Sequence, residues 1–193
     1  LSLALAPVAE ACTRAVYLGP EDRILTGRTM DWKMPIVSNL WVFPRGIARD
    51  GAAGARSVTW TSEYGSLAVS GYDIATADGM NEAGLVVNLQ WDVEAQYPED
   101  DGVTPAISLS VFPQYLLDRY ASVADAVTDL ADNPVLVQGG DVPVGPPGRA
   151  ATVHVSLSDK TGDSAIIEFV DGEMTIWHDR NYQVMTNEPT YDR

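Results

Sequence analysis

The sequence holds a single cysteine, few basic residues and no long hydrophobic run. With Cys12 alone, the 193-residue chain can form no intramolecular disulfide. Only 12 basic residues accompany 27 acidic ones, and the net charge of −15 disfavours nucleic acid and anionic membranes as partners. No window approaches the ~20 consecutive apolar residues that a membrane-spanning helix needs. A disulfide-stapled scaffold, a nucleic-acid-binding protein and a helical membrane protein are therefore not expected.

The remaining composition is that of an ordinary globular chain. Hydrophobic residues make up 46% of the sequence and charged residues 20%. A chain of this length builds one substantial core, and no repeat or linker-like tract divides it. We interpret the acidic excess as a feature of a solvated surface rather than as a docking patch for cations.

The order of the predicted elements is strands, then helices, then strands. Short apolar or alternating runs bounded by Gly, Pro and Asp predict strands within residues 13–43, where the first two form a hairpin. Two more strands are expected to be joined near Tyr64 and Gly65. A turn at Asp78-Gly79 and a short turn at residues 81–84 are expected to precede a buried strand. This order predicts the α+β class with antiparallel sheets.

Two helices are predicted in the middle of the chain. Within residues 106–132, apolar residues recur at spacings of three and four, and Ser122 is a plausible N-cap with Asp125 at the third helical position. Residues 133–150 are rich in Gly and Pro and predict a surface loop. Four strand-like runs at regular spacing then follow.

The beginning of the chain raises the question of what its only thiol does. Residues 1–11 are mostly apolar and end in Ala9-Glu10-Ala11, the small-x-small pattern that signal peptidase accepts. We therefore predict a remnant of a secretory signal peptide over 1–11, a domain over 12–193, and a periplasmic or secreted protein.

Three interpretations of Cys12 compete. It is a buried core thiol, a lipid-anchored cysteine, or a nucleophile that becomes the N-terminus after cleavage. The lipoprotein interpretation is weakened because Ala9 stands where bacterial lipoproteins usually place Leu or Val.

An N-terminal cysteine has the chemistry for the third interpretation. Its α-amino group, with a pKa near ~7.7–8.0, lies beside the thiol and can act as the general base. The predicted hairpin would return Arg28 and Asp31 to the thiol, where a cation favours the thiolate and a carboxylate can hold the amine. The structural alternative is a local ion pair between Arg28 and Asp31.

At these residues the chain resembles the choloylglycine hydrolase family, N-terminal-nucleophile amidases that include bile salt hydrolases and penicillin V acylases. The resemblance rests on separated motifs in the family's order: "ACTR", "GRTMDW", "DGMNEAGLVVNLQW", "SLSDKTGDSAIIEFVDG" and "YQVMTNEPTYD". It is strongest to the Gram-negative penicillin acylase type. It implies the αββα N-terminal-nucleophile hydrolase fold, of which this chain would be the N-terminal portion.

The resemblance also implies roles for individual residues. Cys12 matches the nucleophile, Arg28 the guanidinium beside the thiolate, and Asp31 the carboxylate that holds the α-amine. Asn187 matches an asparagine that contacts the oxyanion and the substrate amide. The family has a further arginine in a later segment, beyond the strand that carries the asparagine. In this chain that position would lie after Arg193, and Arg193 cannot be assumed to take its place.

Substrate-binding residues are predicted in two places: on the strand that ends "NLQW", and just after the second strand of the predicted hairpin. Asn88 and Trp91 are both candidates, and strand alternation places them on opposite faces. The resemblance favours Trp91, with Trp32 opposite it. Trp41 and the segment 91–102 are further candidates for the pocket wall.

The predicted function is an exported hydrolase of linear amide C–N bonds that acts on N-acyl amides through a thioester. Penicillin V and N-acyl homoserine lactones are favoured substrates; a bile salt hydrolase and a non-catalytic exported binding module are the alternatives. No cofactor or metal is expected, because His154 and His178 stand isolated on strand-like runs. The expected partner is a small-molecule amide, and the family resemblance implies a homotetramer.

Overall fold

The computed structural model describes residues 11–191 and consists of stacked antiparallel sheets with two helices. The large sheet has the order β13-β12-β11-β8-β7-β6-β3, and every neighbouring pair in it is antiparallel. Its strands are β3 (Leu40–Phe43), β6 (Ser66–Gly71), β7 (Ala75–Asn81), β8 (Val86–Trp91), β11 (Val153–Ser158), β12 (Ser164–Val170) and β13 (Glu173–His178). The predicted α+β class is confirmed.

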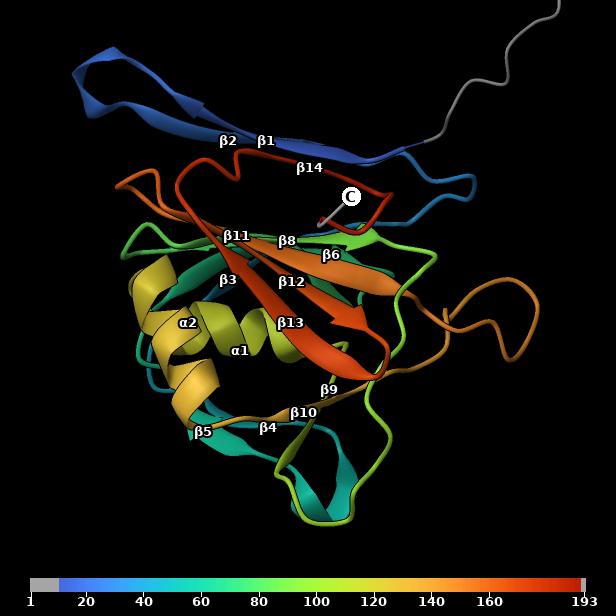
Figure 1. Cartoon of the computed structure of the whole chain (residues 1–193). Coiled ribbons are helices and arrows are strands. Elements are labelled where there is room, and N and C mark those ends of the chain that lie inside the picture. The colour runs from blue at the N-terminus through green and yellow to red at the C-terminus, as the bar shows by residue number, and fades with distance from the viewer. Residues whose placement is uncertain (1–10, 192–193) are drawn as a thin grey trace, which may run out of the picture.

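A three-stranded sheet of order β14-β1-β2 covers one face of the large sheet, and the helices cover the other (Figure 1). Its strands are β1 (Thr13–Leu18), β2 (Ile24–Thr29) and β14 (Val184–Thr186). The helices are α1 (Phe112–Arg119), which packs against β7 and β8, and α2 (Val123–Asp132), which contacts β12. The predicted hairpin is therefore confirmed, as are the two helices.

Four short strands lie below the helices in the view of Figure 1. The strands β4 (Ala48–Asp50) and β5 (Thr59–Thr61) pair antiparallel, whereas β9 (Ala106–Ser108) and β10 (Leu136–Gln138) pair parallel. Two 3-10 turns span Pro20–Asp22 and Gly54–Arg56. The strand β10 lies inside the segment that was predicted to be loop only. None of the helices in residues 11–191 is long and apolar enough to cross a membrane.

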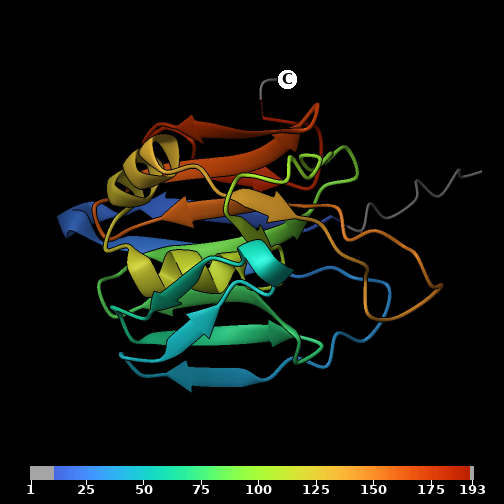
Figure 2. The ribbon, with the colours of Figure 1, turned by 90° about the horizontal axis from the view of Figure 1, so that it is seen from below.

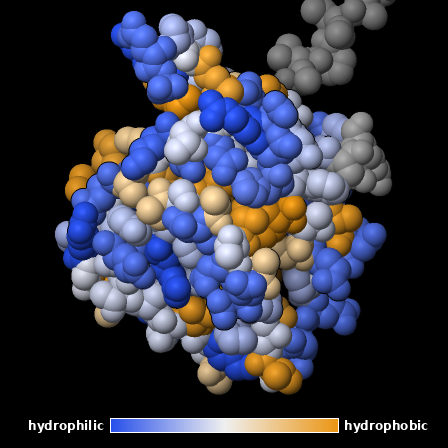
Figure 3. Space-filling view, turned by 60° about the vertical axis from the view of Figure 1, so that its left-hand side comes forward, coloured by the Kyte–Doolittle hydropathy of each residue, from blue (hydrophilic) through white to orange (hydrophobic). Residues whose placement is uncertain are grey.

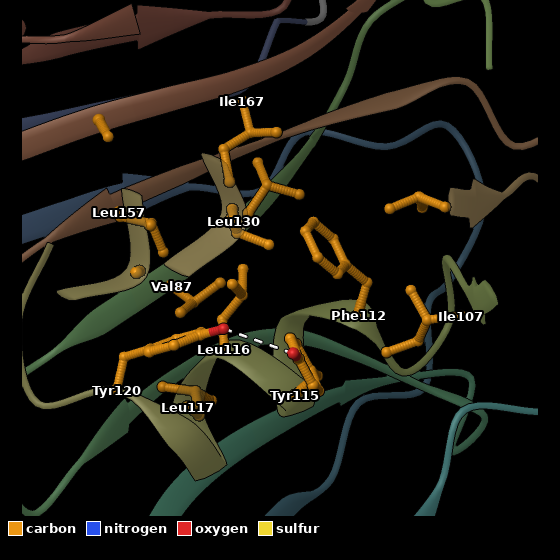
Figure 4. Close-up of a cluster of buried hydrophobic side chains, with 14 of the residues drawn as sticks. Val87, Ile107, Phe112, Tyr115, Leu116, Leu117, Tyr120, Leu130, Leu157 and Ile167 are labelled. Atoms are coloured by element: carbon orange, nitrogen blue, oxygen red, sulfur yellow. Dashed lines mark hydrogen bonds between the residues drawn. The ribbon is translucent and has the colours of Figure 1, made fainter. Parts of the chain in front are cut away.

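The hydrophobic core lies between the helices and the large sheet (Figure 4). Phe112, Leu116 and Leu117 of α1 are fully buried against strand residues such as Val87 and Leu157. Burial of each such side chain contributes roughly 1.5–3 kcal/mol. The N-cap of α2 is as predicted, because the Ser122 hydroxyl accepts the Asp125 amide at 3.2 Å.

Polar residues dominate the exterior in the space-filling view and are interrupted by hydrophobic patches (Figure 3). This agrees with the excess of acidic residues in the sequence.

The arginine of β1 joins the two sheets. Arg14 is completely buried and donates to the carbonyls of Leu157 and Tyr182 at 2.7 and 3.0 Å, and to the Ser164 hydroxyl at 3.0 Å. Burial lowers the pKa of Arg14 to about 10. Because its acceptors lie on β11, on β12 and before β14, Arg14 fixes β1 over the large sheet.

The predicted turn at Asp78-Gly79 is wrong, because both residues lie inside β7. The chain reverses at the second predicted turn, residues 81–84, which is confirmed: the Asn81 side chain accepts the amides of Ala83 and Leu85 at 3.1 and 3.0 Å. Gly79 serves close packing instead. A Cβ atom built there would lie 2.5 Å from a methyl group of Leu117 on α1.

We therefore predict that Gly79→Ala destabilises the fold by about 1–3 kcal/mol through overpacking of α1 against β7. Gly27→Ala is the matched control, since a Cβ there would have no atom within 4 Å. Urea unfolding of the two variants should give a lower midpoint for Gly79→Ala only. Equal midpoints would contradict the packing role of Gly79.

Candidate active site

The strand β1 brings together the three chain segments that carry the predicted catalytic residues: the segment before β1, the end of β2 and the segment after β14. Thr13 pairs with Thr29 of β2 on one side and with Thr186 of β14 on the other. Cys12 precedes this register point, so Asp31 and Asn187 follow the two partner strands close to it. The Cys12 thiol donates to the Asp31 backbone carbonyl at 3.6 Å.

Cys12 is 4% exposed and lies on the wall of a cavity of about 350 Å³ that is lined mainly by apolar side chains. Arg28 and Asp31 line the same cavity, together with Trp32 and Trp91. The structure thus brings five of the predicted site residues to one cavity. Asn187 lines a second cavity, which shares Asp31 and both tryptophans with the first.

Arg28 does not form an ion pair with Asp31 in the described part of the chain. Its guanidinium lies 3.4 Å from the carboxylate of Asp78 and also donates to the backbone carbonyl of Leu89. Burial raises the pKa of Asp78, while the charge of Arg28 and a hydrogen bond from Asn88 oppose that rise. Asp78 therefore orients Arg28. This role of Asp78 was not predicted from the sequence, because the residue was expected to lie in a turn.

Asn88 and Trp91 occupy different environments, as strand alternation predicts. The Asn88 amide donates to Asp78 at 2.8 Å and lies outside the lining of both cavities. Asn88 thus contacts the partner of Arg28, and its predicted contact with substrate stays a prediction. Trp91 faces Trp32 with ring centroids 5.0 Å apart.

Trp32 is held by a hydrogen bond from its indole to the Tyr72 hydroxyl at 2.9 Å. Trp41 does not reach the cavity: it lies on the edge strand β3, is 46% exposed and donates to Asp73. Of the segment 91–102, only Trp91 lines the first cavity.

Asn187 carries an unused hydrogen-bond acceptor. Its side-chain oxygen Oδ1 is buried, and no donor to it is recorded among residues 11–191. A buried acceptor without a donor is costly, so the segment after β14 holds one polar atom of Asn187 unsatisfied.

A second polar cluster, which no sequence motif had indicated, lies under β14. Asp92, His154 and Glu168 are each 1% exposed, and one possible ligand atom from each lies within 4.8 Å of the others. These residue types could hold a divalent cation. The other histidine, His178, contacts Asp163 at 2.9 Å.

Glu168 links this cluster to the chain beyond Asn187. Its carboxylate accepts the Trp177 indole at 2.8 Å and the Tyr191 amide at 3.0 Å, and lies 3.4 Å from His154. Burial raises the pKa of Glu168, but these hydrogen bonds outweigh it and hold the pKa below its usual value. The charged form of Glu168 is thus the stabilising one.

We predict that Glu168→Gln lowers stability at neutral pH by about 1–3 kcal/mol. One of the two carboxylate oxygens becomes an NH2 group, which cannot accept a hydrogen bond and would face the backbone amide of Tyr191. A carboxyl with a lowered pKa stabilises the fold above its ordinary pKa, near ~4.3, and loses that contribution as the pH falls through its folded pKa. The difference between wild type and variant should therefore shrink in acid.

Urea unfolding between pH 7 and pH 3.5 measures this difference, with the exposed Glu173→Gln on β13 as the control. A wild-type advantage over Glu168→Gln that stays constant across this range would refute the assigned charge state.

Comparison with known proteins places these motifs in a family. The model of the choloylglycine hydrolase family, linear amide C–N hydrolases, matches residues 12–193. The chain is similar to a penicillin V acylase of Pectobacterium atrosepticum, with 44% identity over 195 residues covering 96% of this chain and 51% of that protein. It is also similar to a bile salt hydrolase/transferase of Clostridium perfringens, with 30% identity over 187 residues that cover 94% of this chain and 54% of that protein.

A solved penicillin V acylase from Agrobacterium tumefaciens has a similar structure. Its TM-score is 0.85 at 52% identity, and the match covers 94% of this chain and 54% of that one. The chain spans about half the length of the relatives it matches. The likeness confirms the predicted fold class.

Proposed function

Because this chain belongs to the choloylglycine hydrolase family of linear amide C–N hydrolases, we propose that the complete protein is an amidase with Cys12 as its nucleophile. The observation that carries the proposal is the position of the only cysteine. Its thiol lies at the head of β1, on the wall of an apolar cavity and beside Arg28 and Asp31. A thiol kept only for packing would need neither charged neighbour.

The first step forms a thioester. The α-amine of Cys12, freed by cleavage after Ala11, takes the thiol proton, and the sulfur attacks the substrate carbonyl carbon. Asp31 holds the amine, and Arg28 stabilises the thiolate. Asn187, on the wall of the second cavity, contacts the substrate amide, and its side-chain N–H groups donate to the oxyanion.

The C–N bond then breaks, and the protonated α-amine returns its proton to the leaving amine. Water attacks the thioester and gives a proton to the α-amine, which passes it back to the sulfur as the carboxylic acid leaves. The cycle consumes one water and needs no redox partner.

An aromatic or medium acyl chain suits the first cavity. Trp32 and Trp91 pack against each other with their ring centroids 5.0 Å apart, so a substrate ring would pack on the indole surfaces that line the first cavity, not between them. Such surfaces favour an aromatic acyl group such as phenoxyacetyl. Penicillin V and N-acyl homoserine lactones are therefore preferred over bile salts as substrates. We include in the proposal a periplasmic or secreted location; residues 1–10, on which it rests, lie outside the described residues.

Replacing the thiol tests the nucleophile. Cys12→Ser should reduce release of free amine from penicillin V by orders of magnitude, because a hydroxyl is not ionised at neutral pH. The variant should keep the wild-type unfolding midpoint, since the two groups nearly match in size. Wild-type turnover by the serine variant of the complete chain would exclude Cys12 as the nucleophile.

Blocking the leader tests the base. A complete chain with bulky residues at Ala9 and Ala11 should retain residues 1–11 and lose activity by about 10²–10⁴-fold, because an amide nitrogen cannot accept the thiol proton. A chain that begins at Cys12 is the control. Equal rates, with the leader shown by mass to be present, would rule out the α-amine as base.

A further inference from the structure

The second cavity, of about 400 Å³, adjoins the first where Asp31, Trp32 and Trp91 line both. Cys12 lines only the apolar first cavity, whereas Asn187 lines the second. An acyl group in the first cavity would therefore direct the amine part of the substrate into the second. The chemistry of the second cavity determines which amines fit.

Arg149 forms one wall of the second cavity. It belongs to the loop between β10 and β11, which projects from the same end of the molecule as the loop that follows β2 (Figure 1 and Figure 2). Its guanidinium carbon lies 5.0 Å from the ring centroid of Trp32 and 5.0 Å from that of Trp91. Arg149 is thus fixed against both aromatic rings that separate the cavities.

The guanidinium of Arg149 has no recorded oxygen partner in the part of the chain that the structure describes. The other described arginines each donate to, or form an ion pair with, a protein oxygen. This difference is notable in a chain with 27 acidic and 12 basic residues. A guanidinium that lies over aromatic rings and has no protein oxygen as partner can donate its N–H groups to a ligand.

We propose that Arg149 is a specificity-determining residue that binds a negatively charged group, such as a carboxylate, on the amine part of the substrate. The proposal rests on the proposed amidase function and adds the class of leaving group. It favours N-acyl derivatives of amines that carry an acid, as penicillin V does. An N-acyl homoserine lactone, whose leaving amine has no acid group, would gain nothing from Arg149.

The remaining charges of the cavity do not replace Arg149. Asp31 and Glu188 are negative, and Asp31 is already assigned to the α-amine of Cys12. Lys33 is exposed, and its ammonium is a point charge that cannot form the paired hydrogen bonds of a guanidinium. Because the chain has a net charge of −15, its overall field repels anions. An anionic substrate is therefore preferred over a neutral one only if a local cation binds it.

A matched pair of substrates tests the proposal. Penicillin V and its methyl ester share the acyl group and the ring system and differ only in the charge on the amine part. We expect the complete enzyme to prefer the acid in kcat/KM, and Arg149→Gln to reduce this acid-to-ester ratio about tenfold or more. Arg149→Lys should retain part of the preference, and Lys33→Gln should change the ratio less than Arg149→Gln does.

Equal losses for acid and ester in Arg149→Gln would overturn the proposal and leave Arg149 as a packing residue. An equal effect of Lys33→Gln on the ratio would also overturn it, because general electrostatics would then suffice. If the wild type cleaves neither compound, the amidase function fails; calorimetric binding of both compounds to Cys12→Ser then decides the role of Arg149 separately. Tighter binding of the acid that depends on Arg149 supports the inference, and equal binding refutes it.

Discussion

The central position of β1 in its three-stranded sheet is the constraint on which the site depends. Pairing with β2 and β14 brings the segments after both strands to the position of Cys12, although Asn187 is far from it in sequence. Arg14, buried and bonded to oxygens near β11, β12 and β14, holds this sheet on the large one. Displacement of β1 would separate the thiol from every other site residue and leave a buried charge without acceptors.

The second consequence of this arrangement is the division of the site by an aromatic pair. Trp32 follows β2 and Trp91 ends β8, so their contact joins the small sheet to the large one. The apolar cavity containing Cys12 lies on one side, and the polar cavity containing Asn187 lies on the other. An amide that spans the two cavities places its acyl and amine parts in different chemical surroundings.

The sequence was informative where local patterns decide the structure. The hairpin that returns Asp31 to Cys12, the Ser122 cap and the pairing of Trp32 with Trp91 were all predictable from strand alternation, capping chemistry or family motifs.

The failures have physical reasons. The turn predicted at Asp78-Gly79 was wrong because Gly79 allows close packing of β7 against Leu117 of α1, although Asp-Gly is a common turn pair. The cluster of Asp92, His154 and Glu168 was missed because these residues belong to three separate segments, namely the chain just after β8, the strand β11 and the strand β12, which become neighbours only through the sheet order. Arg149 was missed because its loop has no sequence signal for where it folds.

The chemistry assigned to Cys12 is tested most directly by trapping the intermediate. The complete mature protein would be mixed with penicillin V, quenched in acid within milliseconds and digested for mass spectrometry. A phenoxyacetyl group on the sulfur of an N-terminal Cys12 peptide, formed and lost at the rate of turnover, is the predicted result. Turnover without an acyl adduct, or with the adduct on another residue, would contradict the assignment of Cys12 as nucleophile.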